Sequence, residues 1–165
     1  MDLVELVPLI PSLIVDMRYA STQNITGKVL YQPADAIPRL EKAAAQRLIV
    51  AANILAAENL RLVFWDGYRT LAAQAELRAV NNDSNYVSDD SNHCRGVAVD
   101  VTVADTEGNY LDMGSDFDEF SPRAHVDADN LSAQQVANRA ILRQAMEAAG
   151  FTQWPFEWWH YDLKQ

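Results

Sequence analysis

SNHCRGVAVDVTV, residues 91–103, contains the clearest strand pattern in the chain, because valine alternates with smaller or polar residues from Gly96 onward. The side chains of a strand point alternately to its two faces. The valines at 97, 99, 101 and 103 therefore share one face, which we expect in the core, and Asp100 lies on the other among small residues. An unpaired carboxylate is costly to bury, so Asp100 needs a cation or several hydrogen-bond donors beside it.

Two histidines near this strand indicate a metal site. His93 lies in the preceding loop, seven residues before Asp100, and Gly96 between them allows a tight entry into the strand. His160 lies in the aromatic segment 156–163, FEWWHYDL, which we expect to form a strand that pairs beside the first. Imidazole and carboxylate are suitable zinc ligands, and a catalytic zinc takes about three of them and leaves one position for water. We therefore expect His93, Asp100 and His160 to bind one Zn²⁺ per chain.

Glu157, three residues before His160, is the candidate general acid/base. A glutamate close to a metal but not bound to it can take a proton from the attacking water and pass it to the leaving amine. Residues 157 and 160 of a straight strand face opposite ways, so Glu157 must lie on a turn, which Pro155 favours. A lone His or Asp in a strand is usually structural, and only the combination of these residues indicates a metal site.

The rest of the chain predicts a mixture of helices and strands. Apolar periodicity and short apolar runs indicate helices over 39–58, 71–80 and 133–149, and strands over 15–19, 61–66, 96–103 and 156–163. Pro38 suits the first turn of the first helix, Thr70 caps the second, and Ser132 with Gln135 forms a capping box for the third. Because no regular βαβ rhythm appears, we expect one α+β domain over residues 1–165. Its central sheet should be mostly antiparallel and packed by helices, with the zinc site in a cleft on the sheet.

Composition excludes several classes of protein. The net charge of −10 opposes binding to nucleic acids and to anionic membranes. Cys94 is the single cysteine, so an intrachain disulfide and a CxxC zinc site are excluded. The first fifteen residues contain acidic residues and two prolines but no Lys or Arg, which does not fit a secretory signal, and no stretch approaches a membrane span. We expect a soluble, cytoplasmic protein, and the sequence does not specify its oligomeric state.

These motifs resemble the D-alanyl-D-alanine dipeptidases, the vancomycin-resistance-type members of the zinc D,D-peptidases. SNHCRGVAVD matches the family pattern SxHxxGxAxD, and EWWH at 157–160 matches its ExxH signature. The resemblance covers nearly the whole chain. Further blocks that resemble the family are YA at 19–20, NITGK at 24–28, WDGYR at 65–69 and MGSDFDEF at 113–120.

The resemblance implies a role for several further residues in the hydrolysis of a small D,D-dipeptide. Arg69 would stabilise the oxyanion of the tetrahedral intermediate, which suits a guanidinium that stays cationic and donates two hydrogen bonds. Asp118 would pair with the free ammonium group of the substrate, Tyr19 would share that contact, and Ser91 would bind near the other end. Asp66 would orient Arg69. For Asp118, Tyr19, Ser91 and Asp66, a solvated or packing role explains the sequence equally well.

Four other residues near these motifs have simpler interpretations. Trp158 and Trp159 suit core packing on alternate faces of a strand, and Trp158 is our choice for a wall of the substrate's methyl pocket. His125 lies in a polar loop and is expected to be exposed. Cys94 neighbours a ligand, but a metal-dependent hydrolysis needs no thiol nucleophile.

The chain also departs from the family. The segment between Arg69 and Ser91 and the loop between Thr26 and Tyr31 are shorter than in the vancomycin-resistance members, so the cleft is expected to be more open. Longer peptides could then enter, and a D,D-carboxypeptidase or related cell-wall peptidase is an alternative to the dipeptidase. A non-catalytic zinc-binding module and a metal-free structural protein are the remaining alternatives.

Overall fold

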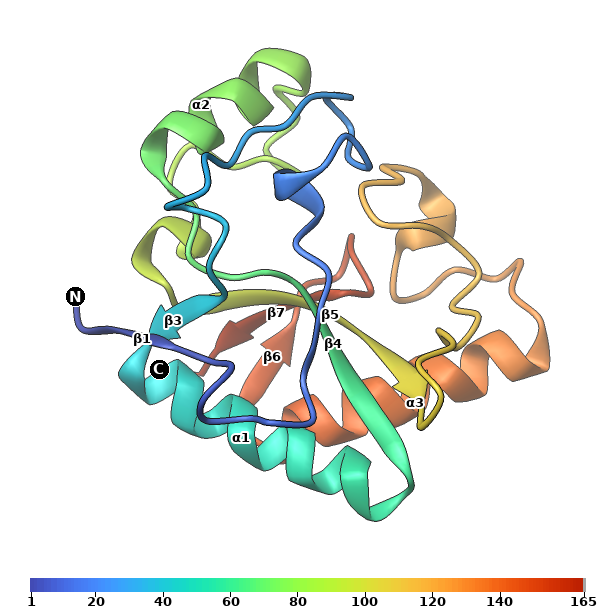
Figure 1. The fold of residues 1–165 in the computed structure, drawn as a ribbon. Helices are drawn as coiled ribbons and strands as arrows, with labels where there is room; N and C mark the ends of the chain where they lie inside the picture. The colour runs from blue at the N-terminus through green and yellow to red at the C-terminus, as the bar shows by residue number, and fades with distance from the viewer. Residues whose placement is uncertain (165) are drawn as a thin grey trace.

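The central sheet has five strands in the order β2–β4–β5–β7–β6 in the computed structural model, which describes residues 1–164 (Figure 1). The strands are β2 (Ile14–Val15), β4 (Leu60–Asp66), β5 (Ala98–Asp105), β7 (His160–Leu163) and β6 (Phe151–Gln153). β2 runs parallel to β4, and the other three pairs are antiparallel. This arrangement confirms the α+β class and the mostly antiparallel sheet.

Two long helices cover the valine face of the sheet. α1 (Lys42–Ala57) and α3 (Ala133–Ala148) lie side by side beneath it in Figure 1. α3 begins at the predicted capping box, because the Ser132 side chain accepts from the Gln135 N–H and the Gln135 side chain accepts from the Ser132 N–H. α2 (Leu71–Val80) lies apart from them at the opposite end of the molecule and begins, as predicted, after the N-cap Thr70.

The second face of β5, which carries Asp100, is also covered. Ala98, Asp100 and Thr102 are all buried. Aromatic residues from distant segments lie over this side: Phe117 contacts the rings of Tyr19 and Trp159 with centroids 5.5 and 5.7 Å away. Asp100 therefore lies inside the protein, where it needs a partner even more than the sequence implied.

The first helix begins later than predicted. Residues Arg39–Glu41 form β3, which pairs with β1 (Leu3–Glu5) in a separate two-stranded sheet, and α1 starts only at Lys42. Glu41 caps α1, because its carboxylate accepts from the Ala43 N–H. Its own N–H donates to the carbonyl of Gly96, so a contact distant in the sequence keeps this stretch extended.

Two predicted strands are also shorter in the structure. β2 ends at Val15, and Arg18–Ala20 forms the 3₁₀ turn η1. β7 begins at His160, and residues 154–159 form turns. The prediction of a strand over 156–163 was therefore wrong in its first half, and β6, with three residues, was too short to predict. Two further 3₁₀ turns are η2 (Asn92–Arg95) and η3 (Pro122–Ala124), and no helix within residues 1–164 is long and apolar enough to cross a membrane.

Candidate active site

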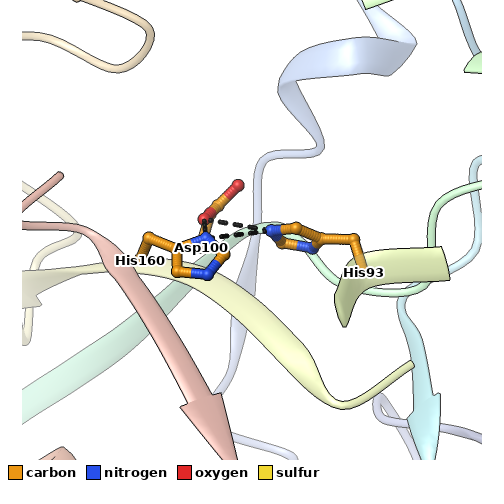
Figure 2. A group of neighbouring side chains, drawn as sticks. All are labelled: His93, Asp100 and His160. Carbon is orange, nitrogen blue, oxygen red and sulfur yellow. Dashed lines mark hydrogen bonds and ion pairs between the residues drawn. The ribbon is translucent and has the colours of Figure 1, made fainter. Parts of the chain in front are cut away.

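His93, Asp100 and His160 converge on one point of the sheet (Figure 2). Asp100 on β5 lies directly opposite His160 on β7 in the antiparallel register, and His93 comes from η2 just before β5. His160 Nδ1 lies 3.1 Å from Asp100 Oδ1, and His93 Nε2 lies 3.4 Å from the same oxygen. One ligand atom from each residue lies within 4.8 Å of the others. This donor set can hold a metal ion and fits the N/O ligation of a catalytic site.

In each imidazole, the nitrogen that points away from Asp100 has a hydrogen-bond partner. His93 Nδ1 lies 2.8 Å from the carbonyl oxygen of Gly67, and His160 Nε2 lies 3.2 Å from Asp162 Oδ1. A carbonyl and a carboxylate only accept, so in the neutral rings these nitrogens carry the protons. The lone pairs of His93 Nε2 and His160 Nδ1 are therefore available to a cation, an arrangement typical of metal-binding histidines.

Local geometry explains how the ligands reach their places. Gly96 has φ +68°, and a Cβ there would lie 2.9 Å from the backbone nitrogen of Glu41. Only glycine suits this turn, which brings His93 back over β5, as the sequence predicted. Asp162 was not predicted, although it lies two residues after His160 on the same strand and hence on the same face. Asn92 fixes it by donating to Oδ1 at 2.8 Å.

Glu157 lies beside the cluster on the turn that precedes β7, which confirms the predicted irregularity. Its Oε2 is 3.7 Å from His160 Nδ1. Burial raises the pKa of the Glu157 carboxyl well above its ordinary value, and the nearby carboxylates of Asp100 and Asp118 add to the effect. Burial acts in the same direction on Asp100, but the two imidazoles outweigh it and hold its pKa below the usual range. The site thus pairs a carboxylate that stays ionised with a carboxyl group whose affinity for a proton is raised by burial.

The Arg69 guanidinium is held on several sides. Its Nε and Nη2 donate to Asp66 Oδ2 at 3.0 and 2.8 Å, and its Nη1 donates to Gln74 Oε1 at 2.8 Å. Its Cζ lies 4.9 Å from the centroid of the Tyr19 ring. Among the described residues, one hydrogen on Nη1 and one on Nη2 have no hydrogen-bond acceptor, although Asp100 Oδ2 lies 3.6 Å from Nη2, so the group can donate two hydrogen bonds to a bound anion. Gln74 and Tyr31, whose hydroxyl donates to Asp66 Oδ1, were not predicted.

Asp118 is a buried carboxylate with neutral partners. Tyr19 Oη donates to its Oδ1 and the Ile25 N–H donates to its Oδ2, both at 3.0 Å. Burial raises the pKa of Asp118 to about 7, because the opposing hydrogen bonds and the more distant Arg69 charge compensate only in part. A buried acid with so little neutralisation is suited to receive a cationic group from a ligand.

A cavity of about 190 Å³ joins these groups. Its lining includes His93, Asp100 and His160 together with Glu157, Arg69, Asp118, Tyr19 and Ser91. The Ser91 Oγ also accepts a hydrogen bond from the His93 N–H and so begins η2. The structure therefore brings together nearly all the site residues suggested by the sequence, and Asp66 lies just behind them against Arg69.

Several side chains near the cavity lie differently from expectation or need comment. Trp159 lines the cavity, whereas Trp158 lines a second one and donates from Nε1 to Ser115 Oγ at 2.8 Å. Both indoles lie on a turn, so the alternation of a strand did not apply to them. His125 is half-buried, not exposed, and its Nε2 lies 2.9 Å from the Tyr86 hydroxyl. Burial raises the pKa of the Cys94 thiol, which disfavours the reactive thiolate.

Two imidazoles and an aspartate that can hold a metal ion, beside a buried glutamate in one cavity of an α+β domain, form the kind of site that a metallopeptidase has. Comparison with known proteins narrows the class. The chain belongs to the D-ala-D-ala dipeptidase family, whose model matches residues 1–165.

Individual relatives agree with this membership. The chain is 40% identical to a D-alanyl-D-alanine dipeptidase of Escherichia coli K12 over 167 residues, which cover 99% of this chain and 86% of that protein. It is 33% identical to one of Enterococcus faecium over 174 residues, covering 90% and 85%. It is 35% identical to one of Enterococcus faecalis V583 over 174 residues, covering 90% and 84%. The enterococcal alignments are longer than this whole chain, so those relatives carry residues that it lacks.

Proposed function

We propose that this metallopeptidase hydrolyses D-alanyl-D-alanine to two D-alanines and uses one Zn²⁺ per chain. The observation that carries the proposal is the convergence of His93, Asp100 and His160 in one cavity with Glu157 and Arg69. The two imidazole nitrogens and the carboxylate would hold the ion and leave a side open to the cavity. The bound ion would supply Lewis acidity at the scissile carbonyl and make water a competent nucleophile near neutral pH.

The residues of the chain would then move the protons and stabilise the charge. Glu157 would take a proton from the attacking water and deliver it to the leaving amine nitrogen, which its raised pKa supports. Arg69 would donate hydrogen bonds from its two free N–H groups to the oxyanion that forms on the carbonyl oxygen when water attacks the carbonyl carbon. Asp66 would keep the guanidinium in place through the two hydrogen bonds that it accepts.

Recognition of the dipeptide would depend on its charged amino end. Asp118 would pair with the substrate ammonium, and Tyr19 would orient that carboxylate through its hydroxyl. Ser91 would bind near the carboxyl end of the substrate. Trp159 would form a wall of the pocket for the substrate's methyl group, the role that the sequence alone assigns to Trp158. We also propose that the protein acts in the cytoplasm, a reducing compartment that suits its single cysteine.

The alternative activity is that of a D,D-carboxypeptidase that accepts longer peptides. A more open cleft, expected from the short segment between Arg69 and Ser91, favours this alternative. The buried Asp118 favours the dipeptide instead, because an acylated amine offers this carboxylate no charge to neutralise. Comparing D-Ala-D-Ala with N-acetyl-D-Ala-D-Ala separates the two, and we expect turnover only of the free amine.

The main experiment assays D-Ala-D-Ala hydrolysis by the purified protein before and after chelation, with Zn²⁺ then added back, beside elemental analysis of bound metal. We expect one zinc per chain, loss of activity on chelation and its return with zinc. Glu157→Gln should bind zinc normally and lose turnover. If Glu157→Gln stays active, the assigned acid/base is wrong, and if the protein binds zinc but hydrolyses neither peptide, a non-catalytic module is the better description.

A further inference from the structure

Gln74 joins the Arg69 guanidinium to the loop between α2 and η2 (residues 81–91, the Ser88 loop), which lines the cavity. No step of the proposed reaction uses Gln74. The residue is buried, with 4% of its surface exposed. Its Oε1 accepts from Arg69 Nη1 at 2.8 Å, and its Nε2 donates to the Ser88 carbonyl at 2.7 Å. We propose that Gln74 is a positioning residue that fixes Arg69 for the oxyanion through Oε1 and holds the Ser88 loop through Nε2. This inference rests on the proposed function.

The two partners determine the residue type at position 74. A guanidinium only donates and a backbone carbonyl only accepts, so the bridging side chain must accept at one end and donate at the other. The Gln74 amide meets both needs in one orientation. A glutamate there could not donate to Ser88, a methionine could satisfy neither partner well, and an asparagine is one methylene shorter. Leaving a buried partner unpaired destabilises the folded protein.

Gln74 supplies a restraint on Arg69 that Asp66 does not. Both hydrogen bonds to Asp66 go to a single oxygen, Oδ2, and hold only the Nε and Nη2 edge of the guanidinium. A group held at one oxygen can pivot, and Asp100 Oδ2 lies 3.6 Å from Nη2 as a competing anion. Gln74 holds Nη1, the other terminal nitrogen, and thereby fixes the plane of the guanidinium, which lines the cavity.

Gln74 and Arg78, on one face of α2, hold the Ser88 loop through hydrogen bonds to two consecutive backbone carbonyls. Arg78 lies one turn after Gln74, and its Nη1 donates to the Val87 carbonyl at 2.6 Å. Val87 and Ser88 both line the cavity. None of the described contacts of Arg78 involves Arg69, so Arg78 anchors the loop without touching the guanidinium. It therefore provides a matched control for Gln74.

The test compares Gln74→Met, Gln74→Glu and Arg78→Met as zinc-loaded full-length enzymes with D-Ala-D-Ala as substrate. Gln74→Met should lower kcat about 10- to 100-fold, because a misplaced donor is felt mainly in the transition state, and should raise KM as well, because it also releases the Ser88 carbonyl. Gln74→Glu still accepts from Arg69 and should keep most of kcat, but it repels the Ser88 carbonyl and should raise KM. Arg78→Met loosens the same loop and should likewise raise KM and keep kcat.

A spectroscopic readout makes the test independent of turnover. The Nε–H signal of Arg69 in a ¹H–¹⁵N spectrum of the zinc-loaded protein, assigned by its loss in Arg69→Lys, should be sharp in the wild type and in Gln74→Glu. It should broaden in Gln74→Met. Zinc content and thermal unfolding are measured for every variant. Gln74→Asn, too short to reach both partners, replaces Gln74→Met if the latter does not fold.

The proposal is overturned if Gln74→Met keeps the wild-type kcat and a sharp Arg69 signal, or if Arg78→Met lowers kcat as much as Gln74→Met does. Equal loss of kcat in Gln74→Glu and Gln74→Met would also overturn it. If the wild-type protein does not hydrolyse the dipeptide, the proposed function fails, while the Arg69 signal still decides whether Gln74 positions the guanidinium.

Discussion

Replacement of Asp118 by asparagine should stabilise the metal-free protein against unfolding, and its advantage over the wild type should grow as pH rises. Burial places the pKa of this carboxyl at about 7 in the folded protein, against 3.8 for an ordinary aspartate. Between these two values the folded state holds a proton that the unfolded state has lost. The group's contribution to the free energy of unfolding is therefore complete below the lower pKa and is lost as pH rises through the upper one.

The magnitude follows from the size of the shift. A shift from 3.8 to about 7 is about three pKa units, and each unit corresponds to about 1.4 kcal/mol, so the full effect is about 4 kcal/mol. Over the practical window from about pH 5 to about pH 8, roughly 2–3 kcal/mol of it should appear. The asparagine variant also has a weaker acceptor for the Ile25 N–H, but this change is nearly independent of pH and does not alter the slope.

The assay is urea unfolding of both proteins in the presence of a chelator at several pH values, followed by tryptophan fluorescence. The metal is removed because a bound cation would itself depress the pKa of a nearby carboxyl. Wild type should lose stability relative to Asp118→Asn as pH increases, while the variant, although more stable, should hydrolyse D-Ala-D-Ala poorly. A stability difference that is constant with pH, or that changes in the opposite direction, would refute the reasoning that Asp118 is a buried and poorly neutralised acid.

Four further changes test other parts of the structure. Arg69→Met should lower kcat about 10²- to 10³-fold in a steady-state assay, because it removes the donors to the oxyanion. His160→Ala should abolish stoichiometric zinc in the purified protein, as measured by elemental analysis, because it removes one of three ligands. Tyr19→Phe removes a donor to Asp118 and should move the pKa of that carboxyl further upward, which the same urea series detects as a loss of stability that continues to higher pH before it levels off. Leu48→Ala, in the buried stripe of α1, should cost about 2–5 kcal/mol in urea unfolding, with the activity per folded molecule retained.

Much of the local structure could be predicted because its causes lie within a few residues. The cap at Thr70 and the capping box at Ser132 are hydrogen bonds between near neighbours, so both helix starts were correct. The alternation around Asp100 likewise fixed the faces of β5. The need of the Asp100 carboxylate for a cation or several donors then pointed to the histidines, and the spacing of Glu157 and His160 predicted the turn that carries Glu157.

The errors arose where a distant segment outweighed local preference. Arg39–Glu41 has a helical pattern, yet pairing with β1 and the hydrogen bond to Gly96 keep it extended. The orientation of Trp158 and Trp159 depends on the turn before β7, which no periodicity describes. Gln74 is an ordinary residue of an amphipathic helix until the Ser88 loop folds over it.

The sequence by itself determined which groups we propose to carry the chemistry of this protein: two imidazoles, an aspartate, a glutamate and an arginine, each with a recognisable local setting. Only the tertiary structure decided their working properties. The register of β5 against β7 sets Asp100 opposite His160, and the burial of Asp118 raises its pKa to about 7. The physical reason is that residue type and local backbone preference are encoded within a few positions. Burial, electrostatic coupling and orientation depend on segments up to about a hundred residues apart, as with Tyr19 and Asp118.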